Sequence, residues 1–202
     1  MMLHDIDNPE IIHGNTLETD YKEYRKQEKF DVVLMNPPYG GNEKNSVKAN
    51  FPMELRSSET ADLFINIIMF RLKKKGRCAI IIPDGFLFGT DNTKVNIKTK
   101  LLTEFNLHTV VRMPSSVFAP YTGITTNILF FDNTYPTKET WFYSVDMPEG
   151  YKHFSKTRPM KLEHFAEVLD WWDNREEIEI DGFPKAKKYS AETLLNEMNC
   201  NL

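Results

Sequence analysis

The chain has 202 residues, of which 41% are hydrophobic and 27% are charged. This composition is typical of a globular domain with a substantial core, and it excludes a disordered, collagen-like or disulfide-stapled protein. With 29 acidic and 25 basic side chains, the formal net charge is −4. A protein that binds nucleic acid by phosphate neutralisation alone carries a basic excess, so a nucleic-acid substrate here would require another chain for much of the binding.

The cysteines and the hydrophobic segments indicate a reduced, cytoplasmic protein. Cys78 lies inside an apolar run and Cys200 lies close to the C-terminus, which predicts neither a disulfide framework nor a metal cluster. The longest apolar stretches fall far short of the roughly 20 residues of a membrane span, and the first residues lack the pattern of a secretion signal. We therefore expect a cytoplasmic location, no membrane partner and no metal.

The first half of the chain alternates strand and helix patterns. In order, we expect a short strand at 10–12, a strand at 31–35, a long loop at 42–58, a helix at 59–75 and a strand at 77–83. The apolar, β-branched segment 31–35 is typical of a parallel strand covered on both faces. In 59–75 the apolar residues cover most of the helix circumference, which predicts burial against a sheet, and three lysines before Gly76 are predicted to end the helix.

The second half continues this alternation and then changes character. We expect a helix at 93–105, strands at 108–113, 127–131 and 140–145, a helix at 160–173 and a last helix from Ala191. The alternation predicts an α/β doubly wound sheet. The change in pattern divides the chain into a main portion, residues 1–150, and a C-terminal helical extension, residues 151–202.

The segment that carries chemistry follows the strand at 31–35 directly and reads NPPYGG. Open α/β sheets bind ligands at the carboxyl ends of their strands. There the amide oxygen of Asn36 and the carbonyl of Pro37 can each accept one hydrogen of a planar amino group, such as the exocyclic amine of adenine. The prolines fix the direction of that carbonyl, and Tyr39 can stack on a base rotated out of a duplex. Taken alone, two prolines are also a common end to a strand.

These segments resemble a known family. DVVLMNPPYGG resembles the catalytic motif of S-adenosylmethionine-dependent amino-group methyltransferases, in the form typical of N6-adenine enzymes. RCAIIIPDGFLFG and VVRMPSSVFAPYTGITTNILFFD resemble the modification subunit of type I restriction-modification systems, in the same order and at similar spacing. The resemblance runs from about Leu3 to the C-terminus. It implies a partial Rossmann-like methyltransferase sheet, with residues 1–150 as the catalytic portion, and methyl transfer from S-adenosylmethionine to adenine N6 in DNA.

The resemblance also implies roles for individual residues. Asn36, Pro37, Pro38 and Tyr39 would be the catalytic residues that contact the target adenine, and Asn36 would also adjoin the cofactor. HGNTL matches the stretch that lies beside the cofactor's adenine, which implies a cofactor contact for Asn15. A turn-forming asparagine is an equally good interpretation of that residue.

Two further positions match the family downstream. Phe118 lies in an aromatic segment that matches the loop holding the flipped base, so Tyr39 and Phe118 would contact the base together; ordinary packing is the alternative for Phe118. Asp84 follows a strand as in the family's Pro-Asp-Gly, and a capping or turn role explains it equally well.

One part of the family pattern is missing. The family has a glycine-rich cofactor motif ahead of HGNTL, whereas this sequence has no Gly-x-Gly-like turn before Asn36. We therefore expect the main S-adenosylmethionine-binding loop to be absent from this chain, and the isolated chain to be inactive. The strand at 31–35 would then expose an unpaired apolar edge. We expect this edge to self-associate, to pair with the segment 10–12, or to be buried against another chain.

The partners that the resemblance implies are DNA, the specificity (S) and restriction (R) subunits, and a sister modification (M) subunit, with the C-terminal helices contacting S or M. Two other classes stay open: a protein-glutamine or RNA amino-group methyltransferase, and a non-catalytic interaction remnant. For the pair Trp171-Trp172 we favour core packing or subunit contact over a DNA-binding surface, and for the basic run 185–188 a solvated face.

Overall fold

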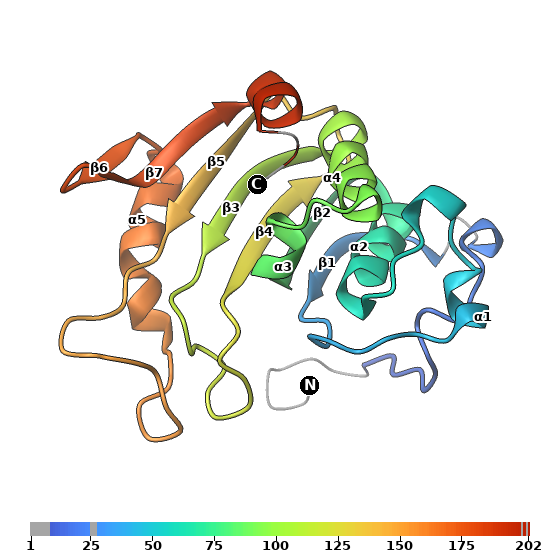
Figure 1. Cartoon of the computed structure of the whole chain (residues 1–202), viewed down its shortest axis with the longest axis horizontal. Coiled ribbons are helices and arrows are strands. Elements are labelled where there is room, and N and C mark those ends of the chain that lie inside the picture. The colour runs from blue at the N-terminus through green and yellow to red at the C-terminus, as the bar shows by residue number, and fades with distance from the viewer. Residues whose placement is uncertain (1–8, 25–27, 199, 201) are drawn as a thin grey trace.

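A seven-stranded sheet organises the described residues, with helices against both of its faces (Figure 1). The computed structural model describes residues 9–24, 28–198, 200 and 202. In chain order the strands are β1 (Phe30–Met35), β2 (Leu72–Pro83), β3 (Asn106–Arg112), β4 (Thr126–Asp132), β5 (Glu139–Ser144), β6 (Ile178–Ile180) and β7 (Phe183–Ser190). The α-helices are α1 (Asn45–Lys48), α2 (Thr60–Arg71), α3 (Asp84–Leu87), α4 (Asn92–Glu104) and α5 (Ala166–Asp173).

The sheet is mixed, with the strand order β1-β2-β4-β3-β5-β7-β6. β1 and β2 run parallel, as do β3 and β5, whereas β4 runs antiparallel to both of its neighbours. Consequently β1, β2, β3 and β5 all end at one edge of the sheet, where β4 begins and where Pro83 pairs with Thr126 and Arg112 with Asn127. We call this edge the carboxyl edge. The predicted α/β class is confirmed, and the residues after β1 lie where such sheets bind ligands.

The two faces of the sheet carry separate hydrophobic clusters. Leu129 and Phe131 of β4 belong to the cluster that α2 and α4 cover. Ile128 and Phe130 alternate with them and pack on the opposite face, in the cluster that contains Trp171 of α5. This alternation is the ordinary period of two along a strand. None of the helices in the described part of the chain is long and apolar enough to cross a bilayer.

The helix predicted at 59–75 is shorter than its pattern suggests. It ends at Arg71, and the chain continues without a loop into β2 at Leu72, which pairs with Phe30 of β1. The three lysines therefore lie in a strand and do not end a helix; Lys73 pairs with Asp31 of β1 at 2.7 Å. The lysines fall in an irregularity of the ladder, since Phe30 pairs with Leu72 and Val32 with Arg77, and Lys75 has a positive φ of 64°. The loop predicted at 42–58 holds α1 and a 3₁₀ turn, Met53–Leu55.

The expected strand at 10–12 is wrong. These residues have no regular structure, and Ile11 and Ile12 are exposed. Pairing of 10–12 with β1 is therefore also wrong. Within the described residues β1 is an edge strand, and Phe30, Val32 and Leu34 are 45%, 50% and 79% exposed. β1 is thus unpaired on one side among the described residues, as expected. The exposed residues alternate with Val33 and Met35, which pack on the core, so one face of β1 is uncovered and the expectation of a strand covered on both faces is wrong. Contact of this strand with another chain or a second copy stays a prediction.

The C-terminal part is not the helical extension that we expected. It contains a 3₁₀ turn, Leu162–Phe165, and α5, but β6 and β7 follow, and β7 pairs antiparallel with β5. The helix predicted from Ala191 is a short turn whose π-helical part is Thr193–Glu197. Strand pairing therefore forms where the sequence showed only an acidic turn and a basic run. The division at residue 150 stays a prediction, although the sheet continues across it.

The paired tryptophans pack inside the protein, as favoured from the sequence. Trp171 is buried with its ring centroid 4.8 Å from that of Tyr143, and Trp172 lies 4.7 Å from Phe130. The basic run 185–188 lies along β7 and is partly neutralised. Lys185 forms ion pairs with Asp146 and Glu167, and Lys188 pairs with Glu139 at 3.0 Å. Lys187 is exposed, whereas the side chain of Lys185 is mostly covered, so the expected solvated face holds for only part of this run.

We expect the central sheet to dominate stability. Phe131→Ala removes a ring that is fully buried between β4 and the α2/α4 layer, and should lower the free energy of unfolding by roughly 3–5 kcal/mol. Phe183→Ala is the matched control, because Phe183 lies on β7 and is 76% exposed; its effect should stay below about 0.5 kcal/mol. Urea unfolding followed by circular dichroism measures both values. Equal losses in the two variants would contradict this assignment of the core.

Candidate active site at the carboxyl edge

The turn that follows β1 brings the predicted catalytic residues together. Asn36 is exposed, Pro37 is buried, Pro38 is exposed and Tyr39 is half-buried. The Tyr39 hydroxyl donates a hydrogen bond to Oδ1 of Asn36. An amide oxygen has two acceptor positions, so this bond orients the Asn36 side chain and leaves the second position free to accept a hydrogen from a ligand.

Phe118 lies against this turn. Its ring centroid is 5.6 Å from that of Tyr39, with an edge-to-face angle of 61° between the planes. Tyr39 follows β1, whereas Phe118 lies in the loop between β3 and β4, so the fold joins two segments that are distant in the sequence. Tyr121, in the same loop, is exposed. The contact agrees with the expected pairing of Tyr39 and Phe118, and their role in holding a base stays a prediction.

Hydrogen bonds within the β3–β4 loop give Phe118 a fixed support. The backbone N–H of Ala119 donates to the carbonyl of Ser116 at 2.9 Å, and that of Tyr121 donates to the carbonyl of Phe118 at 2.9 Å. The hydroxyl of Ser116 accepts from the backbone N–H of Phe154 at 2.9 Å, which joins this loop to the segment after β5. The aromatic ring opposite Tyr39 is therefore held by local turns and by one distant contact.

The two glycines after Tyr39 have backbone angles that favour glycine, with φ of +71° at Gly40 and +107° at Gly41. The carbonyl of Gly41 accepts two hydrogen bonds from Thr60, the first residue of α2: one from its backbone N–H at 3.3 Å and one from Oγ1 at 3.1 Å. The turn is thus attached at both ends, to β1 and to α2. Sequence reasoning missed Thr60 because the contact is non-local.

Burial raises the pKa of Tyr39 to about 12, and the hydrogen bond to Asn36 only partly opposes this effect. The phenol therefore stays protonated near neutral pH. It can donate a hydrogen bond and stack on a ring, but it is not poised to act as a general base.

Asp84 joins three strand ends at the carboxyl edge. Its carboxylate accepts from both terminal nitrogens of Arg112, at 3.1 and 2.8 Å, and from Nδ2 of Asn127 at 2.7 Å. Asp84 begins α3 directly after β2, Arg112 ends β3, and Asn127 lies at the start of β4. The side chain therefore cross-links the strands instead of capping a helix. The sequence signal that we missed is the position of both partners next to the β3–β4 loop.

The side chain of Asn15 stabilises the turn in which it lies. Its Oδ1 accepts the backbone N–H of Leu17 at 3.0 Å, and Leu17 is fully buried. Nδ2 of Asn50 donates to the carbonyls of Leu17 and Glu18, at 3.0 and 2.7 Å, which fastens this turn to the segment after α1. The turn-forming interpretation of Asn15 is confirmed. Its contact with a cofactor stays a prediction.

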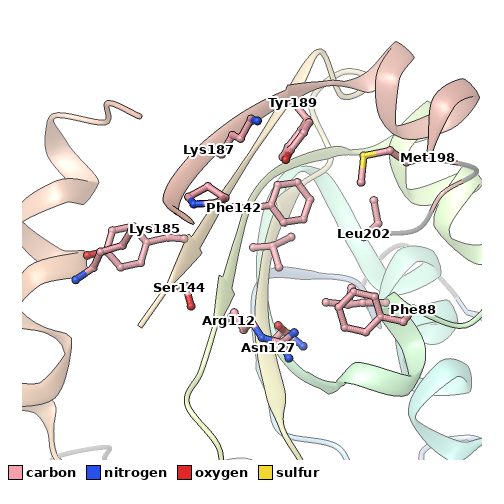
Figure 2. Close-up of a pocket in the computed structure, with 14 residues that line it drawn as sticks. Phe88, Arg112, Asn127, Phe142, Ser144, Lys185, Lys187, Tyr189, Met198 and Leu202 are labelled. Carbon is pink, nitrogen blue, oxygen red and sulfur yellow. The ribbon is translucent and has the colours of Figure 1, made fainter. Parts of the chain in front are cut away.

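One apolar cavity of the described residues is separate from this turn. A cavity of about 300 Å³ lies between α3, β5 and β7, with Phe88, Phe142 and Tyr189 among its apolar walls and Arg112 and Asn127 at one end (Figure 2). Asn36 and Tyr39 do not line this cavity. Asn36 and Pro38 are exposed, so a ligand can reach the turn from solvent.

Comparison with known proteins identifies relatives of this chain. Residues 1–201 match the N-6 DNA Methylase family. The EcoEI methylase subunit of a type I restriction enzyme from Escherichia coli is 50% identical over 175 residues, which cover 86% of this chain and 35% of the relative.

Solved structures agree with this match. The crystal structure of a modification subunit assigned to a type I restriction enzyme from Vibrio vulnificus YJ016 is 42% identical with a TM-score of 0.87, over 96% of this chain and 40% of that one. A chain from a study of complex assembly in the type I restriction-modification system is 35% identical with a TM-score of 0.80, over 96% and 40%. The chain thus spans about a third of the length of its first curated relative.

The raised pKa of Tyr39 predicts a distinct titration. Between pH 7 and pH 10.5 the native protein and Tyr39→Phe should show the same rise in absorbance at 295 nm, because Tyr39 does not ionise in that range. In guanidinium chloride all tyrosines are exposed, so the absorbance of the wild-type chain, with 8 tyrosines, should rise more than that of Tyr39→Phe by the contribution of one tyrosine. A smaller rise for Tyr39→Phe in native buffer would mean that this phenol ionises normally.

Proposed function

Because this chain belongs to the N-6 DNA methylase family, we propose that it takes part in methyl transfer from S-adenosylmethionine to the N6 amino group of adenine in DNA. The observation that supports this most directly is the turn after β1, where the Asn36 amide and the Tyr39 ring lie together opposite Phe118. The amide offers acceptors for an amino group, and the two rings offer a surface for a base.

The proposed chemistry begins with the target amine. The lone pair of an aromatic amine is delocalised into the ring, so the amine is a poor nucleophile. Oδ1 of Asn36 and the carbonyl of Pro37 each accept one of its hydrogens, which favours a pyramidal nitrogen whose lone pair is localised on that atom and available to the methyl group. The buried Pro37 ring limits rotation of the backbone here. Acceptors that are fixed before the substrate arrives lower the barrier more than acceptors that must be ordered during the reaction.

The proposed role of the aromatic residues is to hold an extrahelical base. Chemistry on a base requires that it leave the duplex stack. The half-buried Tyr39 ring offers a face to the base, and the edge-to-face contact with Phe118 keeps that ring in its orientation. Both rings are half-buried and Asn36 beside them is exposed, and in this proposal the extrahelical base reaches them at the carboxyl edge.

The described residues provide fewer contacts for the cofactor than for the target amino group. S-adenosylmethionine, when bound, supplies the methyl group; Asn36 and Asn15 are the residues that we propose to border it. Gly14 is the only glycine before Asn36 in the sequence, and it follows an irregular segment. The described residues thus hold no glycine-rich turn leading from a strand into a helix before Asn36. We propose that the remaining contacts come from outside the described residues.

The proposed partners are those of a type I restriction-modification assembly: the specificity and restriction subunits and a sister modification subunit. Three features support this proposal. Relatives with these sequences are named as subunits of type I enzymes. The net charge of −4 provides little phosphate binding by this chain alone. β1 is an edge strand of the described sheet with exposed apolar side chains on one face, which suits it to contact with a further chain.

An acceptor assay tests the proposed function. Labelled S-adenosylmethionine is offered with duplex DNA, RNA or protein to the longest form of the protein that cells make, together with its co-purifying subunits. We expect label in DNA at adenine N6, and at least a 100-fold loss with Asn36→Ala, because one of two fixed acceptors is removed. Asn45→Ala is the control, since Asn45 is exposed on α1. Transfer of label to RNA or protein, with no transfer to DNA, would reject the proposal.

The edge of β1 gives a separate prediction. The chain should self-associate or join another chain through this edge, so that Leu34→Lys shifts sedimentation toward a smaller species at the same concentration. Leu34 is 79% exposed on β1; Leu162, which is 77% exposed in the turn before α5, gives the matched control Leu162→Lys. A wild-type chain that sediments as a monomer with and without its co-purifying subunits would exclude a docking role for the edge.

A further inference from the structure

The attachment of the Asn36–Tyr39 turn to α2 extends further into the protein. Gly41 follows Tyr39 by two residues, and its carbonyl is held by the backbone N–H and the hydroxyl of Thr60. The neighbouring residues Asn42 and Glu59 form an antiparallel bridge. The first residues of α2 therefore hold the end of the turn that is far from β1.

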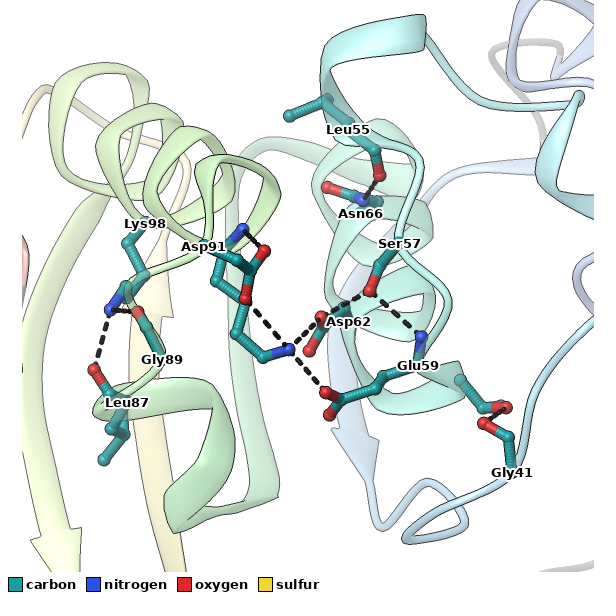
Figure 3. A network of polar contacts seen from close by, with 12 residues as sticks. Gly41, Leu55, Ser57, Glu59, Asp62, Asn66, Leu87, Gly89, Asp91 and Lys98 are labelled. Carbon is teal, nitrogen blue, oxygen red and sulfur yellow. Dashed lines mark hydrogen bonds and ion pairs between the residues drawn. The ribbon is translucent and has the colours of Figure 1, made fainter.

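A buried lysine from α4 holds that beginning of α2. Nζ of Lys94 lies 2.6 Å from Oε1 of Glu59, 3.2 Å from Oδ2 of Asp62 and 3.4 Å from Oδ2 of Asp91 (Figure 3). Lys94 is 5% exposed and Asp62 is fully buried. Burial disfavours the charged ammonium, but the hydrogen bond to Glu59 and the charge of Asp62 outweigh it and raise the pKa of Lys94.

Hydrogen bonds of Ser57 and Asp91 fix the positions of the charged groups in this network. Oγ of Ser57 donates to Oδ2 of Asp62 at 2.6 Å and accepts the backbone N–H of Glu59 at 3.0 Å. Oδ1 of Asp91 accepts the backbone N–H of Lys94 at 3.0 Å and caps α4. The network thus fixes the first turn of α2 against the first turn of α4, and Lys94 is the residue that contacts both.

Stability alone does not account for this arrangement. Burying an ion pair gains little over burying apolar side chains of the same size, because desolvation offsets the attraction. Buried charges fix relative positions more strictly, since their geometry has few alternatives. Lys98, one turn along α4, is also fully buried, yet it donates to the carbonyls of Leu87 and Gly89, at 2.7 and 2.8 Å. The two lysines therefore hold different elements: Lys98 holds the end of α3, and Lys94 the start of α2.

We propose that Lys94, acting through Glu59 and Thr60, is a positioning residue that holds the Asn36–Tyr39 turn in its reactive geometry. This inference rests on the proposed function for its kinetic consequence, but not for its structural one. Lys94 touches no atom of the turn; the hydroxyl of Thr60 makes the last contact of the relay. Of the proposed cofactor contacts only Asn36 lies in this turn, and the remaining ones lie elsewhere, so disruption of the relay should lower kcat much more than it changes the KM for S-adenosylmethionine.

Four variants test the relay in the same co-purified assembly. Thr60→Val keeps the shape of the side chain and removes the hydroxyl; Thr60→Ser restores the hydroxyl. Lys94→Met removes the ammonium, and Lys98→Met is the matched control on the same helix. We expect kcat to fall at least tenfold in Thr60→Val and Lys94→Met with KM for S-adenosylmethionine within twofold, and to stay within threefold of wild type in Thr60→Ser and Lys98→Met.

Hydrogen exchange supplies a readout that does not depend on turnover. In Thr60→Val and Lys94→Met the backbone amides of residues 36–48 should exchange at least tenfold faster than in the wild type, while those of β3 and β4 stay unchanged. Lys98→Met should leave residues 36–48 unchanged. Thr60→Val keeps the buried charges, so it remains informative if Lys94→Met fails to fold.

The outcomes are distinguishable. Equal losses of kcat in Lys94→Met and Lys98→Met, or faster exchange at residues 36–48 with an unchanged kcat, would overturn the relay. If the wild-type assembly transfers no methyl group to adenine, the proposed function fails. The exchange data then decide the relay alone: unchanged exchange at residues 36–48 in Thr60→Val overturns it, and faster exchange supports it.

Discussion

The parallel pairing of β1 with β2 is the constraint on which the rest of this molecule depends. It pairs Met35, the last residue of β1, with Ile80, close to the end of β2 at Pro83, so that Asn36 and Asp84 emerge at the same edge of the sheet. The antiparallel strands β4 and β3 then bring the loop that carries Phe118 to that edge. A slip of one residue in this register would turn the side chains of β1 to the opposite face and carry the turn away from Phe118.

Around this pairing, the site is assembled from contacts of different strength. The turn has a covalent connection to β1 and hydrogen bonds to Thr60 at its other end. The ring of Phe118 meets it from a loop that is held by its own turns. Asp84 links the ends of β2, β3 and β4 behind that loop. In the charged network around Lys94, the ammonium and Asp62 are buried, where electrostatic interactions are strongest, whereas Glu59 and Asp91 are partly exposed to solvent.

The sequence predicted those parts that short-range pattern determines. The apolar run of β1, the period of α4 and the NPPY turn were all recognisable, and the family resemblance identified Phe118 as a neighbour of Tyr39. The parts that it did not predict depend on distant partners. Lys73 lies in a strand because Asp31 and the rest of β1 lie beside it. β7 forms because β5 offers it an edge. The contact between Thr60 and Gly41 joins segments whose approach no local pattern encodes.

The hydrogen bond from Tyr39 to Asn36 has a consequence for recognition. An exposed asparagine samples several rotamers, and a ligand that needs one of them must restrict that motion, at a loss of roughly 0.5–1.5 kcal/mol of binding free energy for each side chain it immobilises. Here the phenol of Tyr39 already restricts the amide, so this loss of conformational entropy is incurred when the chain folds and not when a ligand arrives. A single aromatic residue thus contributes to affinity through its hydroxyl as well as through its ring.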